Sequence, residues 1–555
     1  MSSVSKGLQA RRGLARAALF GLAAAILVCS CSKRETPADA AAREKILMVG
    51  NAADPECLDP ALTTGLAESK ILNALFEGLV TADSRDLSIR PAAAKSWKIS
   101  DGGRTYEFEI DEKARWSNGD KLSARDFEFA WRRALNPKIG AEYASMFDAI
   151  KNAKLIRMGR ARPEELGVEA VGDSVLRVEL ERPVPNFLDM LTHTAFMPLH
   201  RPTLEKFGAA QSRDAKWTRP GNMVSNGPFV LKYWSIGDKI RVEKNPLFRA
   251  ADKVRLNGII FYPISNINTE DRAFRAGQLH VTDSVAPMRL DAIRGQMPEC
   301  LRNAPVFGVY YYMLNAARPP LNDPRVRKAL AISIDRAAII DNFLRGGQSP
   351  ALSFVPPGCG GYETAQSAKF SEDAAEARRL LAEAGFPGGA GFPRLRLTYN
   401  TSEQHKPIAE AVQQMWKKNL GIDVELYNLS WPAYLDARKR GDFDIARASW
   451  IADFPDPENF LENFESGCAR NHSSFSDARF DALMSKSRRT PERNARLREL
   501  AAAEERLTNL AAMIPIYFYS RLNLVSPAVA NWHANALDYR NWQDIDLISR
   551  QPEGD

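Results

Sequence analysis

Apolar positions along the chain recur with two spacings, one typical of strands and the other of helices. In the second half of the chain, Leu395 and Leu397 alternate with polar residues, as in a half-buried strand. Residues 405–420 follow with apolar positions at helical spacing, and Gly421 ends that helix before a second strand begins at Val424. A strand, a helix and a strand in this order predict a β-α-β unit and therefore an α/β fold.

Longer apolar runs predict strands that are buried on both faces. Residues 309–315 (VYYYMLN) and 513–519 (MIPIYFY) contain few polar residues, which is typical of central strands in a mixed sheet. Helical spacing and helix-start residues predict helices over 69–80, 126–135, 323–340 and 373–384. With 555 residues, 45% of them hydrophobic, the chain is long enough for more than one core.

The first 45 residues are predicted to be a targeting segment and a tether. Residues 1–30 carry basic residues and no acid, and their apolar run over 17–28 is too short to span a bilayer. Ser30 before Cys31 resembles a lipoprotein signal, with cleavage before Cys31 and a lipid on its sulfur. A secretory peptide that is removed without lipidation is the alternative. The polar, alanine-rich stretch 31–45 is then a flexible tether between a membrane and the fold.

Charge and motif content argue against several classes of function. The formal net charge of +7 falls to +3 without residues 1–30, and basic residues are interspersed with acids, so no nucleic-acid surface is predicted. The six histidines are scattered, and neither His-Glu-x-x-His nor Gly-x-Ser-x-Gly occurs. We therefore expect no enzyme activity, no bound metal and no cofactor. Up to two disulfides, in three connectivities, are possible among Cys57, Cys300, Cys359 and Cys468.

Residues 431–461 combine flat aromatic side chains with both signs of charge, which suits a ligand that is charged at both ends. A strand is predicted over 443–450, and the Asp-Phe-Pro-Asp-Pro run after it forces a turn. Asp453 therefore stands at the end of a strand, where open α/β sheets place their ligand sites. Asp453 can instead cap its own backbone, and the aromatic residues can instead be core. The candidate residues in this stretch are Trp431, Arg438, Arg447, Trp450 and Asp453.

The same stretch is similar to the extracytoplasmic oligopeptide-binding proteins of ABC importers, in family 5 of the solute-binding proteins. Their Trp-x-Ala-Asp segment matches Trp450 to Asp453, and residues 91–137 resemble a block typical of the family. The resemblance covers nearly the whole mature chain. It implies a two-lobed periplasmic-binding-protein-like fold (type II) of the α/β class with an inserted accessory domain. The implied boundaries are 46–78, 203–305 and 518–555 for lobe I, 79–202 for the insert, and 306–517 for lobe II.

The resemblance also implies which residues contact the ligand. In the family the Asp holds the α-ammonium group of a peptide, a role that falls here to Asp453. Candidates for the peptide carboxylate, each of which also fits an ordinary structural role, are Arg438, Arg447 and His405. Side-chain pockets would be walled by Tyr143, Trp431 and Trp450. Some relatives have a cysteine pair at the positions of Gly308 and Ile451, and this chain lacks it.

The implied function is that of the substrate-binding component of an ABC importer. Such a protein is lipid-anchored in the periplasm, is a monomer, and captures short peptides between two lobes by hinge closure. The permease and its ATPase subunits would be separate chains. One alternative is a receptor of the same fold for a non-peptide solute, such as a metal chelate or haem. A more distant alternative is a secreted hydrolase that uses Asp453 and Asp456 as a carboxylate pair.

Overall fold

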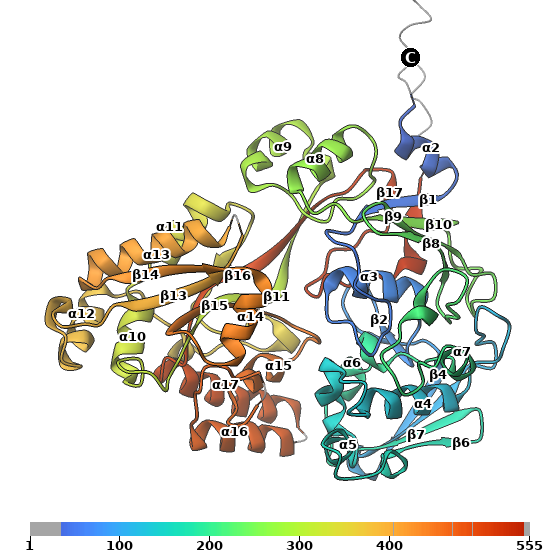
Figure 1. Ribbon diagram of the computed structural model, residues 1–555, viewed down its shortest axis with the longest axis horizontal. Helices are drawn as coiled ribbons and strands as arrows, with labels where there is room; N and C mark the ends of the chain where they lie inside the picture. The colour runs from blue at the N-terminus through green and yellow to red at the C-terminus, as the bar shows by residue number, and fades with distance from the viewer. Residues whose placement is uncertain (1–34, 403, 469, 491, 549–555) are drawn as a thin grey trace, which may run out of the picture.

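The computed structural model describes residues 35–402, 404–468, 470–490 and 492–548, with only the backbone at positions 431 and 432. Figure 1 shows two bodies side by side, joined by two long strands, β11 (Leu301–Leu314) and β16 (Met513–Leu524). These strands pair in antiparallel fashion, from Leu301 opposite Leu524 to Met313 opposite Met513. Each body has its own hydrophobic core. This arrangement agrees with the predicted two-lobed α/β fold.

The second body is built on a six-stranded mixed sheet with the order β12-β16-β11-β15-β13-β14. Its other strands are β12 (Ser349–Pro350), β13 (Leu395–Asn400), β14 (Val424–Leu429) and β15 (Ile445–Ile451). Strand β13 pairs in parallel with both β14 and β15, and α13 (His405–Leu420) connects β13 to β14, so the predicted β-α-β unit is confirmed. The other helices of this body are α10 (Pro324–Ile332), α12 (Ala374–Glu383), α14 (Trp431–Lys439), α15 (Glu458–Leu461), α16 (Ala478–Arg489) and α17 (Arg493–Asn509).

The first body contains two four-stranded sheets. One has the order β1-β10-β9-β8 and is formed by β1 (Ile46–Gly50), β8 (Phe229–Ser235), β9 (Lys239–Lys244) and β10 (Gly258–Tyr262). The other has the order β4-β5-β7-β6 and is formed by β4 (Ala94–Ser100), β5 (Thr105–Ile110), β6 (Val168–Val171) and β7 (Val175–Glu179). The main helices are α3 (Leu66–Leu75), α4 (Ala124–Leu135), α8 (Ile267–Arg275) and α9 (Leu290–Gln296).

Helix α4 shows why the sequence forms this part of the fold. Ser123 and Asp126 form a reciprocal capping box at its start, as their spacing predicts. Phe127 and Trp131 recur on one face of the helix and are fully buried. The indole Nε1 of Trp131 donates to the carbonyl oxygen of Phe196 at 2.9 Å, so the helix is fixed by apolar packing and by one buried hydrogen bond.

Two predicted helices differ from the structure for local reasons. The helix expected over 323–340 is divided, because Asp335 caps a new helix, α11 (Arg336–Ile339). Arg336 is fully buried there and donates to backbone carbonyls of several segments, among them those of Ala351 and Pro515 at 3.0 and 2.8 Å. The helix expected over 69–80 is α3, which ends at Leu75, where the Leu75 carbonyl accepts from the amide of Gly227 at 2.8 Å.

The region predicted to be a tether contains a packed helix, α2 (Pro37–Arg43). Ala38 and Ala42 are buried, and the amide of Ala38 donates to the carbonyl oxygen of Gly277 at 2.8 Å. The prediction of a flexible tether is therefore wrong for these seven residues. The predicted signal, including Cys31, lies outside the described residues.

The four cysteines in the described part of the chain are thiols, and no disulfide joins Cys57, Cys300, Cys359 and Cys468. Within the part of the chain that the structure describes, no helix has the length and apolar character needed to cross a membrane.

Candidate ligand-binding site

Strand β15 carries the candidate residues because it lies inside the sheet and then leaves it at a turn. It pairs with β11, where Tyr312 lies opposite Arg447 and Val309 lies opposite Trp450. Beyond Ile451 the chain turns into α15, whose first residue, Glu458, follows the second proline of the Asp-Phe-Pro-Asp-Pro run. Arg447 thus lies within the sheet, and Asp453 lies just beyond its edge.

Arg447 is a buried cation among tyrosines. Its residue is 8% exposed, one Nη donates to the hydroxyl of Tyr519 at 3.0 Å, and its guanidinium carbon lies 4.8 Å from the ring centre of Tyr310. Among the described side chains, no carboxylate forms an ion pair with it. Because a buried charge without an opposite charge is unfavourable, this position suits a negatively charged ligand group.

His405 lies beside the arginine at the start of α13. Its ring centre is 5.6 Å from that of Tyr310, and the residue is 9% exposed. Burial, assisted by the charge of Arg447, lowers the pKa of His405 to about 3. The imidazole is therefore neutral near pH 7, so His405 can offer a hydrogen bond to a ligand but not a positive charge.

The other candidates on α14 are less well defined. Arg438 is half-buried in the last helical turn, with its guanidinium carbon 5.7 Å from the ring centre of buried Tyr434. Burial raises the pKa of Tyr311 to about 12, and the positive charges of Arg438 and Arg447 act in the opposite direction. Trp431 begins α14, but its side chain lies outside the described part of the structure.

Asp453 is held by two uncharged groups. The hydroxyl of Tyr143 donates to its Oδ1 at 3.2 Å, and the amide Nδ2 of Asn459 donates to its Oδ2 at 3.2 Å. Among the described residues, no lysine, arginine or histidine forms an ion pair with this carboxylate. The predicted contact region therefore brings Tyr143, Trp450 and Asp453 together, and the acid keeps its capacity to bind a cation.

The contact between Tyr143 and Asp453 joins the two bodies. Tyr143 lies in a 3-10 segment, Glu142–Ala149, of the predicted insert, and its ring centre is 4.3 Å from that of His193. Burial and the neighbouring Asp453 raise the pKa of the Tyr143 hydroxyl, which keeps it a proton donor. Phe454, the next residue after Asp453, is 5% exposed and packs in the core of the first body.

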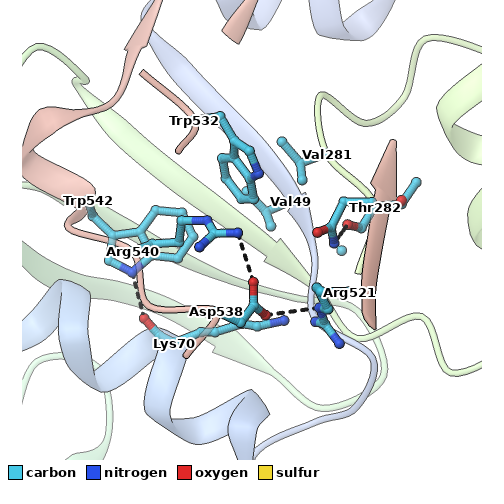
Figure 2. Close-up of a pocket in the computed structure, with 11 residues that line it drawn as sticks. Val49, Lys70, Val281, Thr282, Arg521, Trp532, Asp538, Arg540 and Trp542 are labelled. Carbon is cyan, nitrogen blue, oxygen red and sulfur yellow. Dashed lines mark hydrogen bonds and ion pairs between the residues drawn. The ribbon is translucent and has the colours of Figure 1, made fainter. Parts of the chain in front are cut away.

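A pocket in the first body is distinct from this site. Figure 2 shows Asp538 between Arg521 and Arg540, at 2.9 and 2.8 Å, with Trp532 above them. Arg521 also pairs with Asp283 at 2.8 Å. Its acids and bases are matched inside the protein, so this pocket anchors the connecting strand β16 and does not present a free charge.

Several residues of the site carry no signal that sequence reasoning used. Asn459 and His193 are ordinary polar residues until the fold brings them to Asp453 and Tyr143. The tyrosines of β11 and β16 were expected only as core. Their hydroxyl groups, placed inside apolar runs, were an available signal that these strands line a polar site.

The profile described as "Bacterial extracellular solute-binding proteins, family 5 Middle" matches residues 88–471. This chain belongs to family 5. The periplasmic oligopeptide-binding protein OppA of Escherichia coli, one of its relatives, is 34% identical over 90% of this chain and 92% of OppA. The resemblance inferred from residues 431–461 is thereby confirmed.

Solved structures of similar proteins agree with the fold. The murein tripeptide-binding protein MppA of Escherichia coli gives a TM-score of 0.82 at 33% identity, over 91% of this chain and 98% of MppA. A structure titled as the unliganded open form of MppA gives 0.74 over the same shares. OppA of Haemophilus influenzae, in complex with the peptide RPPGFSPFR, gives 0.80 at 33% identity, over 91% of this chain and 99% of that one.

Proposed function

We propose that this protein is the substrate-binding component of an ABC importer for short peptides. The observation that carries the proposal is a pair of opposite charges, Arg447 and Asp453, neither of which forms an ion pair with another described side chain. A peptide supplies both missing groups, a carboxylate and an ammonium. Binding both ends is favourable because a charge left buried without a partner costs several kcal/mol.

The spacing of these charges fits a peptide of a few residues. Arg447 and Asp453 are six positions apart, and because the chain leaves the strand after Ile451, at most about 20 Å separates their Cα atoms. An extended peptide advances about 3.5 Å per residue, and the long arginine side chain shortens the gap. We therefore propose tripeptides to pentapeptides as ligands. Trp450 and Trp431 would wall side-chain pockets, and Arg438 would serve peptides of another length.

Lobe closure is the proposed means of capture. Tyr143 from the insert bonds to Asp453 of the second body, so the ammonium end of the site is complete only when the two bodies are close. The burial of Phe454 in the first core supports the same view. The closed form would then be recognised by a separate permease with its ATPase subunits. In this proposal lobe I consists of residues 46–78, 203–305 and 518–555, the insert of 79–202, and lobe II of 306–517.

The cellular setting is proposed from the sequence and from the relatives' names. We infer a periplasmic protein, exported by the signal in residues 1–30, anchored by a lipid on Cys31, and monomeric. Mass spectrometry of the membrane fraction tests the anchor: a diacylglyceryl group on Cys31 supports it. A mature protein that lacks this modification contradicts it.

The alternatives are less well supported by the site. Asp456, the second acid needed for a hydrolase, is already paired with buried Arg496 at 2.7 and 2.9 Å. Within the described residues, no group of three or more histidine, cysteine or acidic side chains is arranged to hold a metal ion. A non-peptide solute that offers a carboxylate alone would leave Asp453 without a cation.

Calorimetry with tripeptides to pentapeptides tests the proposal. We expect micromolar binding, about −8 kcal/mol, by the wild-type protein. N-acetylation of the peptide or Asp453→Asn should each weaken binding by about 2–5 kcal/mol, because a buried charge loses its partner. Asp423→Asn, which removes an exposed carboxylate paired with Lys417, is the control and should change nothing. Equal binding of free and acetylated peptides would contradict the assignment of Asp453.

A further inference from the structure

Asn459 is buried at the centre of the polar contacts that surround Asp453. It is the second residue of α15 and is 1% exposed. Its side-chain oxygen accepts from the Trp450 indole Nε1 at 3.1 Å and from the Asp453 backbone amide at 3.0 Å. Its side-chain nitrogen donates to Asp453 Oδ2 at 3.2 Å and to Glu462 Oε1 at 3.5 Å.

These four contacts use the whole hydrogen-bonding capacity of the amide. An asparagine side chain offers two acceptor positions and two donor hydrogens, and each has a partner here. The opposite orientation would set the NH₂ group against two N–H donors and the oxygen against two carboxylates. The orientation of the amide is therefore fixed by its neighbours, and burial excludes competing water.

A second set of contacts links Trp450 to Glu462 through Arg470. Glu462 forms an ion pair with Arg470. The guanidinium carbon of Arg470 lies 5.1 Å from the ring centre of Trp450. The indole is thus held at its nitrogen by Asn459 and at its face by Arg470, and both holders are joined through Glu462.

We propose that Asn459 is a positioning residue that sets the Asp453 carboxylate and the Trp450 indole for the ammonium end of the ligand. This inference rests on the proposed peptide function. Asn459 acts through Asp453 and does not touch the ligand. With Tyr143 on Oδ1 and Asn459 on Oδ2, rotation of the carboxylate is restrained, and its remaining lone pairs are directed to an incoming ammonium group.

A thermodynamic cycle between Asn459 and the ammonium group tests the inference. We expect Asn459→Ala to weaken binding of a free tetrapeptide by about tenfold or more, as for loss of a hydrogen bond to a charged group. The same substitution should change binding of the N-acetylated tetrapeptide by less than about twofold, and should have little further effect in Asp453→Asn. A merely structural defect would weaken both peptides equally.

Asn463→Ala is the matched control. Asn463 is also buried, lies one turn further along the chain, and donates only to the backbone carbonyls of Asn459 and Phe460. It should leave the preference for the free peptide unchanged. Asn459→Ser, which retains a small hydroxyl group, is a milder second variant if the alanine variant does not fold, and it should show a smaller loss of the same preference.

The outcomes separate this inference from the proposed function. If the wild-type protein does not distinguish free from acetylated peptides, the role of Asp453 is wrong. If the wild type does distinguish them but Asn459→Ala and Asn463→Ala lose the same affinity for both peptides, only the positioning role of Asn459 is overturned.

Discussion

The two charged ends of the site are built in different ways. Arg447 lies within β15, and its neighbours Tyr310 and Tyr519 come from the adjacent strand β11 and from β16, the next strand beyond it in the sheet. Asp453 lies beyond the strand, and its neighbours come from α15 and, across the gap between the bodies, from the insert. One end is complete within a single sheet, whereas the other is assembled from both bodies.

Under the proposed lobe closure, the Arg447 contact would be preorganised and the Asp453 contact would depend on closure. The position of Arg447 is fixed by hydrogen-bonded strands, so little order is lost when an anion binds there. In the proposed closure, the contact at Asp453 would gain its Tyr143 hydroxyl only when the bodies approach. A ligand that binds first at Arg447 and then at Asp453 would therefore favour the closed arrangement through its second end.

Removal of the cation at the preorganised end should have the largest effect. We expect Arg447→Met, which keeps the length of the side chain, to weaken binding of a free peptide by about 2–5 kcal/mol, because the peptide carboxylate loses its buried partner. A C-terminally amidated peptide should bind both proteins equally weakly. Calorimetry measures both affinities.

Arg438→Met tests the other candidate cation for the peptide carboxylate. Arg438 is only half-buried and lies on α14, with its guanidinium carbon 5.7 Å from the ring centre of Tyr434. Arg440→Met is the matched control, because Arg440 follows the same helix, is exposed and is paired with Asp436 at 2.9 Å, so its loss should change neither affinity. If Arg438→Met weakened binding of the free peptide and Arg447→Met did not, the carboxylate contact would lie on α14 and not in the sheet. The assignment of Arg447 would then be wrong.

Removal of the apolar contact at the assembled end should act on closure itself. Phe454 is the single described side chain of 306–517 in the first core, so Phe454→Ala removes apolar burial that exists only while the bodies touch. Burial of a phenylalanine contributes about 1.5–3 kcal/mol. We expect peptide affinity to fall by about 2 kcal/mol, whatever the peptide's end groups, and small-angle scattering to show a more open average shape.

A phenylalanine confined to the second core provides the control. Phe480 is fully buried in α16 and packs only within that core. Phe480→Ala should lower the melting temperature but leave the scattering profile unchanged. Equal openness of the two variants would show that Phe454 does not hold the bodies together.

The sequence predicted the strands and the turn of the site better than the contacts that surround Asp453. The alternation and apolar runs that define β13, β15 and β16 are local, and a strand end followed by two prolines placed Asp453 at a turn. Tyr143 and Asp453 are 310 positions apart, and resemblance alone had joined them. Asn459 was missed because its role depends on partners at three positions that meet only after α15 has folded.

The packed helix α2 and the division of the helix after Ile332 also depend on contacts between residues that are far apart in the sequence. The alanines of residues 37–43 are compatible with a helix as well as with a tether. The partner that fixes this helix, the carbonyl group of Gly277, lies more than 200 positions further along the chain. The helix expected over 323–340 is divided where Asp335 caps α11, and Arg336 at the start of α11 donates to backbone carbonyls of distant segments. Local patterns predict an element, whereas distant hydrogen-bond partners decide where it ends.

The smallest expected effect concerns pH and the preorganised end. The pKa of His405 is about 3 in the fold, against about 6.5 in an unfolded chain. Between these values the unfolded chain binds more protons, so the free energy of unfolding falls as pH decreases from about 6.5, by up to about 1.4 kcal/mol per pH unit from this group. Denaturant unfolding of wild type and His405→Gln between pH 7 and pH 5.5 should give curves that diverge towards acid, by about 1.4 kcal/mol at the lower pH, with the variant less sensitive.

A bound peptide sharpens this last comparison. A carboxylate held by Arg447 would offset the positive charge that helps to keep His405 neutral, so it should raise the pKa of His405 and reduce the acid sensitivity of the wild type. An amidated peptide should give no such protection. Parallel curves for wild type and His405→Gln would mean that His405 keeps an ordinary pKa, and hence that the Arg447 end is more hydrated than its buried tyrosines indicate.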